Sequence, residues 1–236
     1  MAKSFPNTGA TVGLAADRSA LASPFAGMQF FEADTSRNWF YNGSTWIPDD
    51  GVFTTEAARD AAITSPTQGM HAYLTAPTTA IVDATGLVTA IPTGVQTIYD
   101  GSVWVVVTPV SACTTTSGTR ASGAWGALTG GGTNPTVTIA TGTMVRVSMS
   151  AKISNNISGN ASQMALAVSG ASTVGAGSFG FNVMGRTTSN YDSSYHVDFI
   201  ATLPSPGVCT FTPNYVASTS TIGTFGNRSI TITGIA

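Results

Sequence analysis

Residues 145–154 read Val-Arg-Val-Ser-Met-Ser-Ala-Lys-Ile-Ser, and this stretch decides the fold predicted for the second half of the chain. Apolar residues alternate with charged or hydroxyl-bearing residues throughout it. Successive side chains of a β-strand point to opposite faces, so strict alternation predicts a strand with one buried and one exposed face. We therefore predict a half-buried strand whose inward residues run from Val145 to Ile153.

The same alternation recurs from about residue 111 to the C-terminus, with turn residues between the segments. Seven to nine short strands at this spacing are typical of an antiparallel β-sandwich or jelly roll. We predict that this mostly β domain covers residues 111–236. Its further core segments are Met164-Leu166-Val168, Phe179-Phe181-Val183, Tyr195-Val197-Phe199, Cys209-Phe211 and Ile230-Ile232.

The first half of the chain contains a repeat. Each copy has an arginine, then Ser-Pro-x-x-Gly-Met, then Tyr-Asn/Asp-Gly-Ser-x-Trp, and duplication of this kind indicates two copies of one structural unit. The copies are Arg18, Ser23–Met28 and Tyr41–Trp46 in the first, and Arg59, Ser65–Met70 and Tyr99–Trp104 in the second.

Each copy is predicted to be a short helical turn followed by a small antiparallel sheet. Thr54 or Thr55 can cap the second helix, and the prolines at 24 and 66 end the two helices. The Asn-Gly and Asp-Gly pairs predict hairpin turns. The domains are thus an extended N-terminal arm (1–17), module 1 (18–50), module 2 with an inserted hairpin (51–110) and the β-sandwich (111–236).

The two tryptophans of the repeat occupy the same place in both copies. A large apolar residue retained at one position of a small module is expected to fill the core of that module. We therefore assign Trp46 and Trp104 to the cores of modules 1 and 2. The other repeat-core residues are Tyr41, Gly43, Tyr99 and Gly101.

The surface predicted from the composition is nearly uncharged. Only 8% of the 236 residues are charged, whereas an average soluble domain has about 25%. Low surface charge favours association, so we expect the chain to belong to an oligomer or larger assembly. The net charge of −2 argues against a broad nucleic-acid footprint. Residues 1–110 contain nine acidic and four basic residues, whereas residues 111–236 contain two acidic and five basic ones. The two halves therefore carry opposite net charge, which indicates either domains with different neighbours or a chance distribution of few charged residues.

The repeat and the β-rich tail resemble parts of bacteriophage virion surface proteins. The module with Ser-Pro-x-x-Gly-Met and Tyr-Asn/Asp-Gly-Ser-x-Trp is similar to short repeats in tail fibres, minor tail proteins and head fibres. The tail, with its closing Leu203–Phe211 and Phe225–Ile232 segments, resembles their C-terminal β-sandwich. The resemblance covers residues 18–236 and implies a trimer or larger symmetric assembly located in the virion and made in the host cytoplasm.

No sequence pattern indicates an active site or a cofactor. His196 and Asp198 share one strand face near Ser193 and Ser194, but no nucleophile-elbow motif accompanies them. Asp49-Asp50 lacks calcium-loop spacing and is interpreted as a turn. We therefore expect no enzyme activity, no metal, no cofactor and no membrane span. Cys113 and Cys209 form one bridge or remain two free thiols.

The expected function is a structural protein of a phage particle, of minor tail or fibre type, whose partners are copies of itself and other virion proteins. One alternative is a capsid decoration or head fibre protein. Another is a module that binds host receptors or glycans, because aromatic side chains stack on sugars. For that alternative the candidate contacts are Trp125, Tyr191 and Tyr195.

Overall fold

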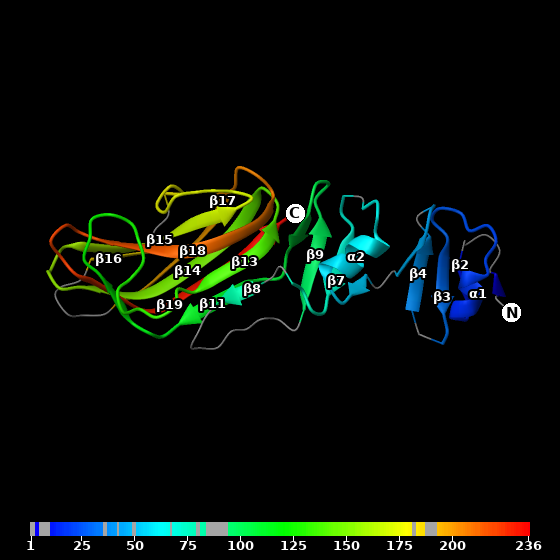
Figure 1. Ribbon diagram of the computed structural model, residues 1–236, viewed down its shortest axis with the longest axis horizontal. Coiled ribbons are helices and arrows are strands. Elements are labelled where there is room, and N and C mark those ends of the chain that lie inside the picture. The colour runs from blue at the N-terminus through cyan, green and yellow to red at the C-terminus, as the bar shows by residue number, and fades with distance from the viewer. Residues whose placement is uncertain are drawn as a thin grey trace.

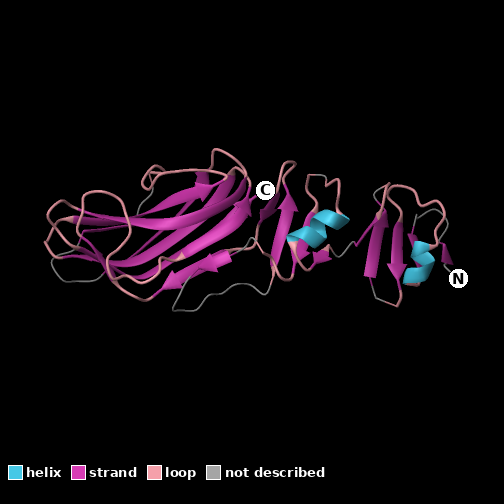
Figure 2. Ribbon diagram, viewed as in Figure 1, coloured by secondary structure: helices cyan, strands magenta, loops and turns pink. Residues whose placement is uncertain are grey.

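Two small α/β modules and one large β domain follow one another along the chain. The computed structural model describes residues 3–4, 10–34, 37–41, 43–48, 51–66, 68–78, 81–83, 94–180, 183–186 and 193–236. Figure 1 shows the three units in a row, with the C-terminus returning to the junction between module 2 and the β domain. Both helices of the described residues lie in the modules, whereas the β domain is built from strands alone (Figure 2).

The β domain is a jelly roll, which confirms the predicted fold class. Its sheets have the strand orders β11-β19-β14-β17 and β16-β15-β18-β13-β8, with β12 beside β19, and their pairings are antiparallel. Most consecutive strands cross between the sheets, while β15 and β16 form a hairpin within one sheet, and the resulting order is that of a double Greek-key jelly roll. The strands are β8 (Ile81–Asp83), β11 (Val110–Thr114), β12 (Gly118–Arg120), β13 (Thr136–Thr141), β14 (Met144–Asn155), β15 (Ala161–Gly170), β16 (Val183–Arg186), β17 (Ser193–Thr202), β18 (Gly207–Ala217) and β19 (Gly223–Ile235).

Most of the predicted core residues that the structure describes are buried in the jelly roll, whereas Tyr195 and Val197 are half-buried against it and Phe181 lies outside the described residues. The inward residues of β14 from Val145 to Ile153 are at most 2% exposed. Inward residues of β15, β18 and β19 are equally buried, among them Leu166, Phe211 and Ile232. Phe179 lies in a turn rather than a strand and packs on the core from there, its ring 6.2 Å from that of Phe199; the turn glycines around it prevent regular pairing.

Module 1 contains more strands than the predicted helix and hairpin. Its sheet has the order β1-β2-β3-β4-β5, and β2 pairs in parallel with β3 through the helix α1. The predicted arm of residues 1–17 therefore needs correction, since β2 and the start of α1 belong to the module. The elements are β1 (Lys3–Ser4), β2 (Ala10–Gly13), α1 (Ala15–Ser19), β3 (Gln29–Glu32), β4 (Arg37–Tyr41) and β5 (Trp46–Pro48).

Module 2 repeats this β-α-β-β-β order. Its strand β6 pairs in parallel with β7 through α2, and the sheet order is β10-β9-β7-β6. Thr55 caps α2 by accepting a hydrogen bond from the Ala58 amide at 3.3 Å. The elements are β6 (Val52–Phe53), α2 (Glu56–Ala62), β7 (His71–Leu74), β9 (Val95–Tyr99) and β10 (Trp104–Val106).

The segment between β7 and β9, where an inserted hairpin was predicted, supplies a strand to the jelly roll instead. Strand β8 pairs with β13, so its hydrogen bonds are made outside module 2. The second half of the predicted hairpin, residues 87–89, lies outside the described residues. This pairing adds a connection between module 2 and the jelly roll.

The repeated motifs adopt the same backbone conformation in both modules. Gly43 and Gly101 have φ values of 100° and 101°, in the left-handed region that hairpin turns of this kind require. The Ser-Pro-x-x-Gly turn bonds identically, with the amide of Gly27 or Gly69 donating to the carbonyl of Tyr41 or Tyr99 at 2.8 Å. The sequence repeat is therefore a repeat of three-dimensional structure.

Candidate functional site

A cavity of about 490 Å³ lies where module 2 meets the jelly roll. This volume falls within the range of about 300–1,000 Å³ that is typical of small-molecule sites. Helix α2, strands β7, β9 and β10 and the turn before β10 form most of its wall, and β13 and β18 of the jelly roll close it. The lining residues used below are Glu56, Arg59, Asp60, Leu74, Thr97, Tyr99, Ser102, Trp104 and Val208.

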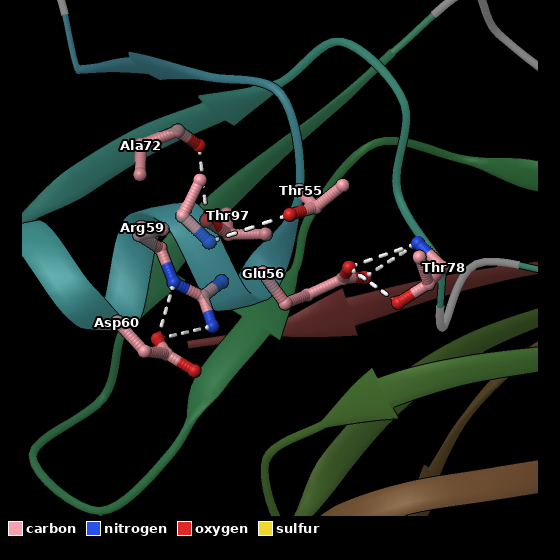
Figure 3. A network of polar contacts seen from close by, with 8 residues as sticks. Thr55, Glu56, Arg59, Asp60, Ala72, Thr78 and Thr97 are labelled. Carbon is pink, nitrogen blue, oxygen red and sulfur yellow. Dashed lines mark hydrogen bonds and ion pairs between the residues drawn. The ribbon is translucent and has the colours of Figure 1, made fainter.

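The guanidinium group of Arg59 is the main cationic group of this cavity. Arg59 is only 5% exposed, and its guanidinium carbon lies 4.6 Å from the centre of a Trp104 ring. Its Nε donates to Oδ1 of Asp60 at 2.9 Å, as Figure 3 shows. A partly buried cation held against an aromatic face and a carboxylate is fixed in orientation, because both contacts restrict the planar guanidinium.

Two carboxylates, four residues apart on one face of α2, flank Arg59. The Glu56 carboxylate accepts hydrogen bonds from the amide and the hydroxyl of Thr78, both at 2.8 Å (Figure 3). The Asp60 side chain remains 57% exposed despite its contact with Arg59. One carboxylate is thus held by the protein, while the other keeps acceptor capacity toward solvent.

The floor of the cavity is apolar and aromatic. Trp104 is 8% exposed, and its ring lies 5.5 Å from that of Tyr99 at a tilted angle. Leu74 is fully buried beside them. The hydroxyl of Thr97, 1% exposed, donates to the Ala72 carbonyl at 2.9 Å, so its polar atom is already satisfied. The site combines an apolar floor with a charged rim.

In module 1 large side chains occupy the positions that correspond to the floor of this cavity. The strand registers align Trp39 with Thr97, Phe30 with Ala72 and Glu32 with Leu74. Trp39 stacks under Arg18 at 3.9 Å, and Glu32, 2% exposed, accepts from Arg18 Nε at 2.6 Å. Module 2 therefore keeps the arginine and loses two aromatic rings and the buried acid.

Of the predicted repeat-core residues, the tyrosine and the tryptophan pack together in each module, whereas Gly43 and Gly101 are exposed at the hairpin turns and belong to no core. In module 1, Trp46 contacts Phe30 in an edge-on geometry at 5.9 Å and Tyr41 at 5.2 Å. Trp46 is half-buried, whereas its counterpart Trp104 is buried. Trp104 also lines the cavity, which the sequence did not indicate.

The three residues predicted for glycan contact do not share one described platform. Trp125 is half-buried and lies against Gly177, where a Cβ would stand 3.0 Å from the indole nitrogen. Tyr195 packs on the core and neighbours Ile153 at the position of Gly185. Tyr191 lies outside the described residues. Glycan binding by this set stays a prediction.

The pair His196 and Asp198 lies on the exposed face of β17, as its alternation predicted. The Asp198 carboxylate accepts from Arg146 Nε at 3.1 Å, and this hydrogen bond lowers the pKa of Asp198. The same contact raises the pKa of Arg146. Asp198 is thus engaged by an arginine on the neighbouring strand.

The described residues show no cluster of three His, Cys, Asp or Glu side chains that could hold a metal ion. No disulfide bond joins Cys113 to the buried Cys209, which decides against the bridge that the sequence left open. Neither helix in the described part of the chain has the length and hydropathy needed to span a bilayer.

A buried arginine that the sequence analysis missed lies inside the jelly roll. Arg228, 0% exposed, donates to the side-chain oxygens of Asn134 at 2.9 Å and Tyr215 at 3.1 Å and to the carbonyls of Thr116 at 3.0 Å and Gly131. These bonds fasten the loop before β13 to the two sheets. Burial raises the pKa of Tyr215 to about 12. Arg228 occupies an inward position of β19, where Ile230 and Ile232 continue the same face. A charged residue in register with apolar ones was the sequence signal that could have identified it.

Comparison with known protein families and with curated proteins gives no match. Among solved structures, the chain is similar to the VP2 subviral particle of infectious bursal disease virus, with 13% identity, a TM-score of 0.39 and coverage of 64% of this chain and 41% of that one. The Gx strain of the same virus gives 10% identity, a TM-score of 0.36 and coverage of 59% and 41%. The chain thus spans about two fifths of these viral chains.

A further similarity is to the CBM22-1-GH10 modules of Clostridium thermocellum xylanase 10B, with 9% identity, a TM-score of 0.30 and coverage of 53% of this chain and 27% of that one. All these scores are low, so function is inferred below from the residues of this chain itself.

Proposed function

We propose that this chain is a non-enzymatic structural protein of a bacteriophage particle, of minor tail or fibre type, that assembles into a symmetric oligomer. The observation that carries the proposal is the outer face of the β15-β18-β13 sheet. These three adjacent strands contain no Asp, Glu, Lys or Arg, and their outward residues are mostly hydroxyl-bearing, amide or alanine side chains. The outward residues include Thr138, Ala140, Gln163, Ala167, Thr210, Thr212 and Asn214.

Such a face is suited to contact with copies of the same chain. Burying a charge without a partner is costly, whereas hydroxyl groups can exchange water for hydrogen bonds across an interface. Thr138 and Thr210 already bond to each other at 2.9 Å, which reduces their need for water. Exposed apolar residues extend this surface at its ends, Met184 and Val208 each being 43% exposed. Closed symmetric assembly is the usual outcome for such self-association.

The sequence resemblance to virion surface proteins and the row of two repeated modules support the particle assignment. The modules would attach the chain to the particle, and the jelly roll would pack around the symmetry axis. Within the described residues, Asp198 is paired with Arg146 rather than with His196, which favours a structural role for that strand face over catalysis.

The test is the oligomeric state in solution. Size-exclusion chromatography with light scattering should give a stable oligomer on dilution, and Thr212→Lys in the middle of the uncharged face should dissociate it. Thr233→Lys, on the outer face of the opposite sheet, is the matched control and should leave the oligomer intact. A dilute monomer that also fails to bind particles would overturn the proposal.

Particle location has its own measurement. Quantitative mass spectrometry of purified particles should find few copies, as expected of a tail or fibre component. Hundreds of copies per particle would instead identify a capsid decoration or head fibre protein.

A further inference from the structure

We propose that the cavity between module 2 and the jelly roll is a carbohydrate site that holds one pyranose ring of a neutral sugar. This inference goes beyond the structural role above and does not depend on it. The cavity is formed by Arg59, Trp104 and their neighbours, and a single sugar unit is consistent with its volume of about 490 Å³.

The first argument is that the cavity results from specific differences between two copies of one fold. Module 1 places Trp39 at the position of Thr97, which lines the cavity, and Phe30 at the position of Ala72, the neighbour of Thr97 on the adjacent strand. Other repeat features, including the φ values of the hairpin glycines, agree between the modules. The backbone is therefore retained while the side chains that would fill the space are absent.

The second argument is the character of the walls. Tyr99 and the aliphatic residues of the lining offer apolar surface beside Trp104, which is 8% exposed and lies under Arg59, and such surface suits the C–H faces of a pyranose ring. Burying those faces releases water from both partners. An aromatic surface inside a cavity with polar groups at one side matches a ligand that is apolar on its faces and polar around its edge.

The third argument is the charge at the rim. Arg59 Nε and Nη2 both contact Asp60, and the Asp60 carboxylate, 57% exposed, keeps acceptor capacity toward the cavity beside the fixed guanidinium group. Adjacent hydroxyls of a sugar can accept from one group and donate to the other, and bonds to charged groups are stronger than neutral ones. Ser102 adds a hydroxyl at the wall.

The same rim disfavours other ligand classes. Glu56 and Asp60 would repel an anion, since these two carboxylates stand against one guanidinium. A purely apolar ligand would desolvate Asp60 and Arg59 without offering hydrogen bonds, which is costly. A neutral polyhydroxylated ring satisfies both the apolar floor and the polar rim.

The experiment is a titration of the full chain, labelled with nitrogen-15, with methyl glycosides of glucose, galactose, mannose and N-acetylglucosamine. The indole N–H signal of Trp104 should shift and saturate with at least one of them at millimolar concentration. The signal of Trp46, the equivalent residue in module 1, is an internal control and should not move.

Two variants test the location of the site. Thr97→Trp places the residue of module 1 in module 2 and should reduce affinity at least tenfold by filling the cavity, while native-like backbone amide signals from β7 show that module 2 is folded. Asp60→Asn changes an exposed side chain and should weaken binding about tenfold, in line with the loss of about 1.4 kcal/mol from one charged hydrogen bond.

Three outcomes would overturn the proposal. The first is that the indole N–H signal of Trp104 does not shift with any of the four glycosides. The second is that a glycoside shifts this signal in Thr97→Trp as much as in the wild type. The third is that the signal moves with protein concentration and not with sugar, which would show that a second copy of the chain covers the cavity. The first two outcomes leave oligomer formation through the jelly roll untouched, and Thr212→Lys tests that separately. The third would agree with it, because Ala140 and Val208 belong both to the cavity wall and to the uncharged face.

Discussion

Replacing Arg228 with methionine should destabilise the jelly roll by about 1–4 kcal/mol. The side chain is fully buried, and its guanidinium group donates hydrogen bonds to four acceptors from separate parts of the chain. Methionine is apolar and can fill much of the same volume, so the variant removes the hydrogen bonds while creating a limited cavity.

The magnitude follows from which acceptors lose their partner. The bonds to the Tyr215 hydroxyl and the Gly131 carbonyl are buried, and each buried group left unsatisfied costs about 1–3 kcal/mol. The bonds to Asn134 and Thr116 are partly buried, so water can replace them at little cost. The Arg228 Nε is buried without a partner, and its removal returns about 1–2 kcal/mol.

Native-state hydrogen exchange with mass spectrometry is the suitable assay, because peptides from β14 and β19 report the jelly roll without the modules. Arg146→Met is the matched control. Arg146 pairs with Asp198 on the exposed face of the same sheet, and an exposed ion pair contributes little to stability because solvent screens it. A loss below about 1 kcal/mol for Arg228→Met, or one equal to that of Arg146→Met, would refute the assignment of Arg228 as the anchor of the loop before β13.

Two further predictions concern Tyr215 and the hairpin glycines. Burial raises the pKa of Tyr215 to about 12 from about 10 in the unfolded chain, so the folded state loses about 3 kcal/mol as the pH rises from about 10 to about 12. Urea unfolding at about pH 9 and about pH 12 should show a smaller pH dependence for Tyr215→Phe than for the wild type, and equal dependences would contradict the burial of an un-ionised phenol. Gly43→Ala and Gly101→Ala should each cost about 1 kcal/mol because both glycines have positive φ, whereas Gly175→Ala, at ordinary φ, should be nearly neutral in thermal denaturation. Equal melting temperatures for all three variants would show that the turns relax.

The jelly roll could be predicted because its signals are local. The inward residues of β14 alternate without interruption, and burial follows the alternation from Val145 to Ile153. The hairpin turns were equally predictable, since Asn-Gly and Asp-Gly pairs require a backbone conformation that few other residues adopt. The strand order of the two sheets was not predicted, because it depends on pairings between distant segments such as β11 and β19.

Elements that depend on distant partners could not be predicted in the same way. Strand β2 is four residues long and pairs in parallel with β3, which requires the helix between them to fold back. Strand β8 has three residues and pairs with β13, more than fifty residues further along the chain. Short strands carry too little periodicity to be recognised when their pairing is not local.

The cavity was beyond the reach of motif analysis for a related reason. Its wall joins α2 to Val208, so two regions far apart in the sequence contribute to it. The repeat did contain one signal, because alignment of the copies places Thr97 opposite Trp39. The alignment alone does not indicate a cavity. It does so only together with the strand registers, which place both residues on the helix-facing side of their sheets.

Duplication explains how one module could acquire a cavity without loss of the fold. In module 1 the buried Glu32 holds Arg18 over Trp39, so the guanidinium group covers a core that the tryptophan ring already occupies. In module 2 Leu74 replaces that acid, and Arg59 turns to its neighbour Asp60, which lies on the exposed side of α2. Since Trp39 is also replaced, by Thr97, the arginine lies over Trp104 and borders an open space. Two substitutions inside the sheet thus convert a packing arginine into one that faces a cavity, while the repeated turns preserve the backbone of both modules.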